Sequence, residues 1–225
     1  MRVCILMSGR PSLYQTALRL LKKQLSPLGQ EELELHALFW NPVSTHHQQE
    51  LRNVFTVRNL WTADPADFSI VKFGRKPDET NAGNFLSMLA GRQLLLDQMI
   101  ANSNFNAAHY DYFLYTRPDV CLNDGITTEA FAELLATIKE KKSVFVPQSG
   151  NWRGGVNDQF AITDFAVMQV YLSLFKHLQD YYVRDRIPLH PELMLQHHLA
   201  TNQIQVEKLS CDNIIFRSEY KFGIG

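Results

Sequence analysis

Two opposite charges follow directly after a hydrophobic run in the segment 110–119. The segment reads YDYFLYTRPD, so the run ends at Thr116 and is followed by Arg117, Pro118 and Asp119. Open α/β sheets bind ligands at the carboxyl ends of their strands, where this tip would lie. Carboxylate oxygens are ligands that Mg²⁺ and Mn²⁺ prefer. We therefore expect Asp119 to hold a divalent metal on a diphosphate, where the metal would act as a Lewis acid on the leaving group.

Arg117 offers the same tip a second chemistry. A guanidinium can bind a diphosphate directly through its planar set of donors. Asn123 and Asp124 follow closely enough in the sequence to act as further metal ligands. The simpler alternative is an ion pair between Arg117 and Asp119 that closes a turn. Because both charges follow a core strand, we favour a ligand-binding tip.

Two other positions are candidates for contact with an anion. Ser8, Gly9 and Arg10 follow the first hydrophobic run, and the backbone N–H groups and guanidinium of such a turn can meet a diphosphate. The turn lacks the motif of a P-loop, so an ordinary strand–helix turn is an equal alternative. Arg92 lies on the apolar stripe of an expected helix. We favour extension of its side chain to solvent. The alternative is that it reaches a buried anion and is one of the donor-binding residues.

Acidic residues in two later segments are candidates for work on an acceptor. Two glycines precede Asn157 and Asp158, and glycine lets the backbone approach a ligand closely. Asp158 would act as general base on an acceptor hydroxyl or bind a sugar hydroxyl, and an Asn-Asp turn is the alternative. His190 and Glu192 lie at an expected helix start. Glu192 would favour the helix dipole and His190 would cap the helix, unless one of them reaches into the site.

Alternating strands and helices would position these residues. Such an order predicts an α/β sandwich with a mostly parallel central sheet. The segment 61–83 has no clear period and is expected to be a long loop. The expected strands are 2–7, 33–40, 54–57, 110–116, 143–146, 159–163, 204–206 and 213–216. The expected helices are 13–25, 45–53, 84–102, 128–139, 164–182 and 191–201.

Composition narrows the class of protein. The chain has 225 residues, of which 45% are apolar and 20% charged, as expected for one α/β domain over 1–225. A net charge of −1 lacks the basic excess of nucleic-acid binders. No apolar run approaches the roughly 18 residues that span a membrane, although peripheral membrane contact stays open. Cys4, Cys121 and Cys211 have no metal-site spacing and are expected to be buried reduced thiols in a cytoplasmic protein.

Four blocks taken together resemble a family of bacterial glycosyltransferases with the GT-A fold. They are Ser8-Gly9-Arg10, the segment 110–119, Asn157-Asp158-Gln159-Phe160-Ala161 and His190-Pro191-Glu192. The resemblance spans most of the chain, and its second and third blocks are the more specific. It implies a GT-A-like three-layer sandwich of the nucleotide-diphospho-sugar transferase type. It also implies transfer of a sugar from a nucleotide-sugar donor to a hydroxyl of a glycan or lipid-linked acceptor. Such proteins often serve surface polysaccharide or lipopolysaccharide synthesis, which would place this one at the inner face of the membrane.

The resemblance assigns roles to single residues. Asp119 matches the metal- or diphosphate-associated acid of a variant Asp-X-Asp motif, and Asp158 matches an acidic position beside the acceptor. His190 and Glu192 match a late motif without a firm role. Arg117 departs from the motif, where an acid is expected, and some GT-A-like enzymes work without metal. A non-catalytic nucleotide- or glycan-binding module of degenerate GT-A fold and a nucleotidyltransferase are the alternatives.

Overall fold

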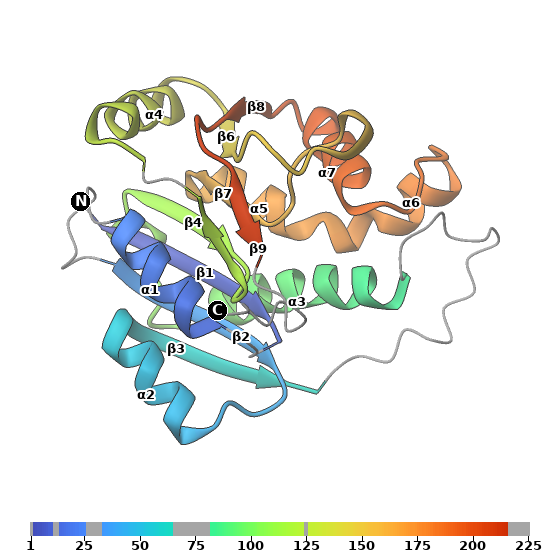
Figure 1. Ribbon diagram of the computed structural model, residues 1–225. Coiled ribbons are helices and arrows are strands. Elements are labelled where there is room, and N and C mark those ends of the chain that lie inside the picture. Colours follow the sequence, from blue (N-terminus) through green and yellow to red (C-terminus); the bar gives the residue numbers. More distant parts are fainter. Residues whose placement is uncertain (1, 11–13, 26–32, 65–81, 124–125, 216–225) are drawn as a thin grey trace, which may run out of the picture.

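A mixed sheet lies at the centre of the molecule (Figure 1). The computed structural model describes residues 2–10, 14–25, 33–64, 82–123 and 126–215. Within these residues, seven strands form one sheet in the order β3-β2-β1-β4-β7-β6-β8, and two short strands form a second sheet. The strands of the large sheet are β1 (Val3–Gly9), β2 (Leu33–Trp40), β3 (Thr56–Ala63), β4 (Tyr112–Thr116), β6 (Ser143–Val146), β7 (Phe160–Thr163) and β8 (Gln205–Lys208). The small sheet pairs β5 (Val120–Leu122) with β9 (Asn213–Ile215).

The direction of one strand decides where the site forms. Strands β3, β2, β1 and β4 are parallel, β7 is antiparallel to both of its neighbours, and β8 is parallel to β6. Because β7 runs against the other six, its first residue pairs with the last residue of β4, Phe160 with Thr116. Residues just before β7 therefore lie beside residues just after β4. The expected α/β class with a mostly parallel sheet is confirmed.

Helices cover both faces of the sheet, which makes three layers (Figure 1). Side chains of β1 alternate between the two cores, with Ile5 in one and Leu6 in the other. The first core is closed by α1 (Tyr14–Gln24), α2 (Thr45–Val54) and α4 (Thr128–Glu140). The second is closed by α3 (Ala82–Ala101), α5 (Phe165–Leu172), α6 (Leu178–Val183) and α7 (Pro191–Thr201).

The structure corrects two expected segments. The long helix over 164–182 is interrupted by a 3-10 turn, Ser173–His177, between α5 and α6. The Ser173 hydroxyl donates to the Val170 carbonyl at 3.0 Å, and such a bond competes with the helical pattern. The strand expected at 54–57 starts two residues later and continues to Ala63, so the expected loop loses its first residues. Most of that loop, 65–81, lies outside the described residues.

The small sheet was not expected from the sequence in this form. The stretch Val120–Leu122 is too short to show a period, yet it pairs with β9 in an antiparallel ladder. All three cysteines are free and buried, as expected. In the described ranges, no helix is both long and apolar enough to cross a membrane.

Candidate functional site

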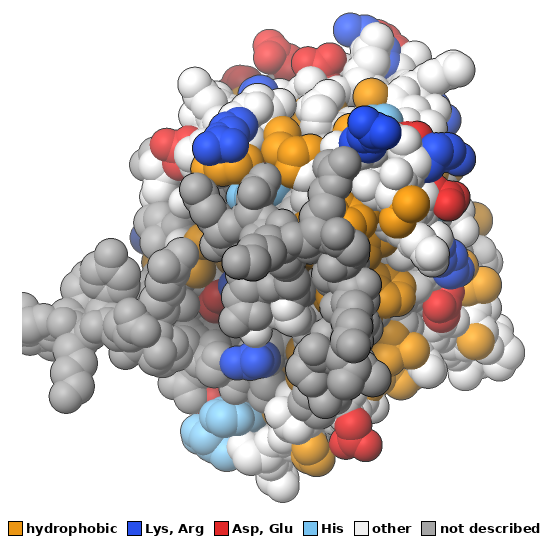
Figure 2. All heavy atoms as spheres, turned by 90° about the vertical axis from the view of Figure 1, so that its right-hand side faces the viewer, with side chains coloured by type: hydrophobic (Ala, Val, Ile, Leu, Met, Phe, Trp, Pro, Cys, Tyr) orange, Lys and Arg blue, Asp and Glu red, His pale blue; other side chains and the backbone are white. Residues whose placement is uncertain are grey.

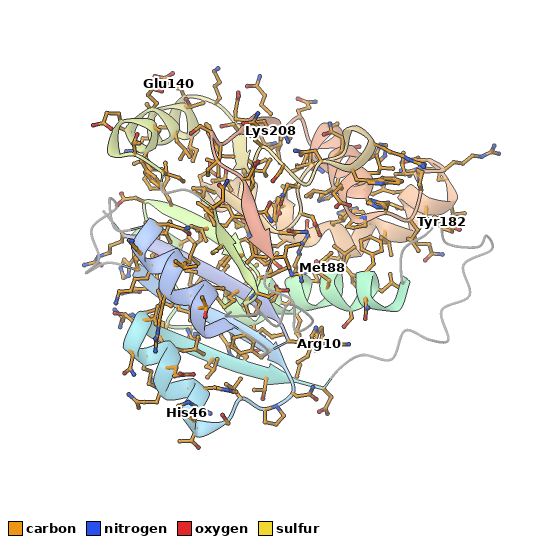
Figure 3. All side chains as sticks on the ribbon, in the orientation of Figure 1. Arg10, His46, Met88, Glu140, Tyr182 and Lys208 are labelled. Carbon is orange, nitrogen blue, oxygen red and sulfur yellow. The ribbon has the colours of Figure 1, made fainter. Side chains whose placement is uncertain are left out.

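The ends of β1 and β4 meet at one edge of the sheet. Met7 pairs with Thr116, which places the Ser8–Arg10 turn beside the Arg117–Asp119 tip. Gly9 has φ +148, and a Cβ built on it would lie 3.0 Å from Cδ of Pro118. Glycine is required here by both its backbone angle and this contact. Figure 3 labels Arg10, which is exposed, at the end of the sheet to which the strands point.

Arg117 and Asp119 form a two-bond pair at this tip. Nε of Arg117 donates to Oδ1 of Asp119 at 2.9 Å, and its Nη2 donates to Oδ2 at 2.6 Å. Burial alone would lower the pKa of Arg117, but the negative charges of Asp119 and Asp158 raise it, so the guanidinium stays charged. The two side chains remain 29% and 21% exposed, respectively. The ion-pair alternative therefore describes the geometry, and the pair still faces solvent.

The described residues do not fit a divalent cation at Asp119. Both oxygens of its carboxylate already accept hydrogen bonds from Arg117. Oδ1 of Asn123, an expected further ligand, accepts from the backbone of Asp212 at 2.9 Å. Asp124 lies outside the described residues, and within the described part no three His, Cys, Asp or Glu side chains gather as metal ligands. Mg²⁺ is usually held by one or two carboxylates together with phosphates and waters, and the positive charge of Arg117 against both Asp119 oxygens opposes a cation there.

Arg92 is fully buried, and the expectation that it extends to solvent is wrong. Its Nη2 lies 2.9 Å from Oδ2 of Asp158 and also donates to the Asp158 carbonyl, while its Nε donates to the Tyr115 hydroxyl at 3.1 Å. The guanidinium also lies over the rings of Tyr115 and Tyr171, at 4.8 and 5.6 Å from their centroids. Burial opposes its charge, but these partners outweigh burial and raise its pKa.

A buried chain of polar contacts joins two strands, a helix and the segment before β7. The Ser8 hydroxyl of β1 lies 3.1 Å from the Tyr115 hydroxyl of β4, and Arg92 of α3 binds both Tyr115 and Asp158. Asp158 lies two residues before the start of β7. The end of β1 and the segment before β7 are thus held in one network.

Asn157 is an anchor for its loop. Its Nδ2 donates to the Ser149 carbonyl at 2.8 Å and to Oδ1 of Asn213 at 2.7 Å. Its Oδ1 accepts from the backbone of Gln159 at 2.9 Å, and its own N–H donates to Asn151 at 3.0 Å. The side chain is buried and its polar atoms bond within the protein. The predicted contact of Asn157 with an acceptor stays a prediction.

His190 and Glu192 form a second pair at the start of α7. Nδ1 of His190 lies 2.6 Å from Oε2 of Glu192, and each side chain is 13% exposed. The His190 ring stacks on Trp152, with centroids 3.9 Å apart and planes 13° apart. His190 occupies the cap position of α7 without a capping bond from its side chain. Trp152 belongs to no motif that the sequence offers, and its place two residues before Gly154 and Gly155 is its only signal.

A close backbone contact holds Glu192 against the segment that leads to Asp158. A Cβ on Gly155 would lie 2.6 Å from atoms of Glu192, and the N–H of Val156 donates to the Glu192 carbonyl at 3.0 Å. The loop before β7 is therefore pressed onto the first turn of α7. Burial, followed by the negative charge of Asp158, raises the pKa of Glu192 to about 7. Such a carboxyl group changes protonation near neutral pH.

The structure thus gathers most of the expected site residues at one edge of the sheet. Figure 2 shows this face, on which the described Lys and Arg side chains are separate rather than joined in one basic patch. Arg10 and Arg117 directly follow the ends of β1 and β4. Arg92 is paired beneath the surface with Asp158. Glu192 and His190 complete the group.

Comparison with known proteins identifies the fold. No protein-family model matches the chain, and no curated protein matches it. The galactosyltransferase LgtC, solved with donor and acceptor sugar analogues, is 12% identical in sequence to this chain, with a TM-score of 0.50. The match covers 91% of this chain and 72% of the LgtC chain. An active-site mutant of LgtC gives the same identity and coverage and a TM-score of 0.51. TarS of S. aureus is 15% identical over 97% of this chain with a TM-score of 0.47, and the chain spans only 37% of it. The chain has the GT-A fold of such glycosyltransferases.

Proposed function

We propose that this protein transfers a sugar from a nucleotide-sugar donor to a hydroxyl of a glycan or lipid-linked acceptor. The observation that carries the proposal is the joint position of two kinds of group at one edge of a GT-A sheet. A partly exposed guanidinium, Arg117, follows β4 at the tip whose Pro118 packs on Gly9 at the end of β1. Glu192, in the first turn of α7, is a carboxyl group whose pKa is raised to about 7 by burial and by the charge of Asp158. LgtC, which has this fold, was solved with donor and acceptor sugar analogues, which supports the reading.

The donor side would bind the diphosphate through the two tips. Arg10 and Arg117 would supply the positive charge that faces the phosphate oxygens. Asp119 would hold the Arg117 fork in place until the donor arrives. Since Arg117 is charged without a metal, it can neutralise part of the charge that develops on the leaving diphosphate.

The transfer itself needs one bond formed and one broken. The acceptor oxygen attacks the anomeric carbon, and the bond from that carbon to the phosphate oxygen breaks. The electron pair leaves with the nucleoside diphosphate, and a protein carboxylate receives the acceptor proton. The four blocks that resemble bacterial surface polysaccharide enzymes support a glycan or a lipid-linked sugar as the acceptor class.

Donor binding tests this proposal with a matched pair of variants. Arg117→Ala removes the fork from the tip, and Arg58→Ala removes an exposed arginine that pairs with Glu34 near the start of β2. Nucleoside diphosphates of uridine, guanosine, cytidine and thymidine are titrated into each protein in the presence of EDTA. Hydrogen bonds to charged groups contribute about 1.5–3 kcal/mol, so Arg117→Ala should weaken binding by about 10–100-fold.

The control fixes the interpretation of this titration. Arg58→Ala should bind the same nucleotide as tightly as the wild type, because β2 begins at the opposite edge of the sheet. Equal losses in both variants would mean that the effect is not local to the tip. A wild-type protein that binds none of the four nucleotides would refute the donor site.

A further inference from the structure

Asp158 is buried and bound by Arg92. Its side chain is 4% exposed, and Oδ2 lies 2.9 Å from a guanidinium that is itself completely buried. Because Asp158 is nearly closed off from solvent and Oδ2 is occupied by Arg92, an acceptor hydroxyl has little access to this carboxylate. Its backbone carbonyl also accepts from Arg92. These contacts suit a residue that fixes the geometry of its surroundings.

Glu192 differs from Asp158 in its side-chain partner and in its exposure. Its partner at 2.6 Å is His190, an imidazole that can share a proton, rather than a permanent cation. Its Oε2 is buried, but its side chain as a whole keeps 13% exposure, against 4% for Asp158. The imidazole is clamped in turn by stacking on Trp152, and the first turn of α7 is clamped by Gly155. A base held by a second group, which is itself oriented by a third, is the usual architecture of proton transfer.

We infer that Glu192, oriented by His190 on the Trp152 ring, takes the proton of the attacking hydroxyl, while Asp158 is a positioning residue fixed by Arg92. This inference rests on the proposed function. The acceptor O–H bond breaks as the oxygen bonds to the anomeric carbon, and the proton passes to a carboxylate oxygen of Glu192. The electron pair of the broken carbon–oxygen bond leaves on the nucleoside diphosphate. The proton then returns to solvent from Glu192, directly or through His190.

The charges around Glu192 set the pH dependence that this step should show. His190 faces it from the start of the same helix, Asp158 from the segment before β7, and Arg92 from α3. Arg153, on the segment packed against α7, lies over the Trp152 ring. Burial and the charge of Asp158 favour the protonated form of Glu192, and Arg92 opposes them. Because the ionised carboxylate is the active form, the rate should rise with pH through neutrality.

The test uses water as acceptor, so no glycan needs to be known. Release of nucleoside diphosphate from a panel of uridine, guanosine, cytidine and thymidine diphospho-sugars is measured between pH 5 and 9. General base catalysis contributes about 10²–10⁴-fold, so Glu192→Gln should lower kcat by that factor and lose the acidic limb of the profile. Binding of the nucleoside diphosphate should be kept. Glu133→Gln, an exposed carboxylate on α4, is the matched control and should behave as the wild type.

Asp158 is tested with its partner replaced at the same time. The double variant Arg92→Met, Asp158→Asn removes both buried charges together. The acidic limb of its pH profile should persist. If Asp158 were the base, that limb would be lost. Independently of activity, a ¹³C carboxyl resonance that is missing in Glu192→Gln should titrate near neutral pH in the wild type. An acidic limb that survives in Glu192→Gln, or a Glu192 resonance that titrates at an ordinary acid pH, overturns the inference alone. A wild type that neither binds nor hydrolyses any nucleotide sugar overturns the proposed function and the inference with it.

Discussion

The buried pair of Arg92 and Asp158 gives the largest stability effect that the structure predicts. The two side chains are 0% and 4% exposed and 2.9 Å apart. Removing one partner of a buried ion pair leaves an uncompensated charge and costs about 3–5 kcal/mol. For a domain of this size, each kcal/mol lowers Tm by about 2–4 °C. Arg92→Met should therefore lower Tm by about 6–20 °C in thermal unfolding followed by circular dichroism.

Two controls separate burial from charge in this experiment. Lys176→Met breaks an exposed pair with Asp97, at 3.2 Å, and should cost at most about 1 kcal/mol. Adding Asp158→Asn to Arg92→Met removes the stranded carboxylate and should recover most of the lost stability. The reasoning is refuted if Arg92→Met lowers Tm no more than Lys176→Met does. It is also refuted if the double variant is less stable than Arg92→Met alone.

Three further predictions concern the loop before β7 and the helix that it holds. Gly155→Ala should cost about 1–3 kcal/mol by overpacking against Glu192 and should reduce nucleotide-sugar turnover. The control is Gly154→Ala, which has no atom within 4 Å of the added Cβ and should cost only its backbone strain. Equal turnover in the two variants would contradict this prediction. Asn157→Ala removes the side-chain bonds to the Ser149 carbonyl, to Oδ1 of Asn213 and to the backbone of Gln159, and should cost about 1–3 kcal/mol in urea unfolding. A change under about 0.5 kcal/mol would count against the anchor. Because the folded pKa of Glu192 is raised to about 7, its stabilising contribution is complete below the unfolded value of 4.5 and is lost as pH rises through 7. The free energy of unfolding of the wild type minus that of Glu192→Gln should fall across this window, and a flat difference would contradict the shift.

The tip at 117–119 and its neighbours followed from the sequence because parallel strands bring their carboxyl ends together. The end of β1 and the end of β4 are adjacent once the alternation of strands and helices is recognised. The placement of Asp158 beside them depended on β7 being reversed, which no local pattern reveals. The resemblance of the ordered blocks supplied that part. The sequence of a hydrophobic run does not indicate whether its strand lies parallel or antiparallel to its neighbours.

The burial of Arg92 could not be predicted from the sequence, for a physical reason. A cation on an apolar stripe is ordinarily better solvated at the surface, so extension to solvent was the reasonable expectation. It is buried because three partners far from it in sequence, Asp158, Tyr115 and Tyr171, converge on it. The stacking of His190 on Trp152 was equally hidden, since the two residues lie far apart in the sequence, in a 3-10 turn and at the cap of α7. Such contacts depend on tertiary geometry that spacing does not encode.

Product analysis tests the central claim most directly. The wild-type protein is incubated with nucleotide sugars and a mixture of glycan and lipid-linked acceptors, and the released phosphate species and the glycosylated acceptor are identified by mass spectrometry. The account predicts free nucleoside diphosphate in equal amount to an acceptor one sugar heavier, with product lost in Glu192→Gln. Release of pyrophosphate would indicate nucleotidyl transfer instead. Bound but unchanged donor would indicate a binding module, and either result would contradict sugar transfer at this site.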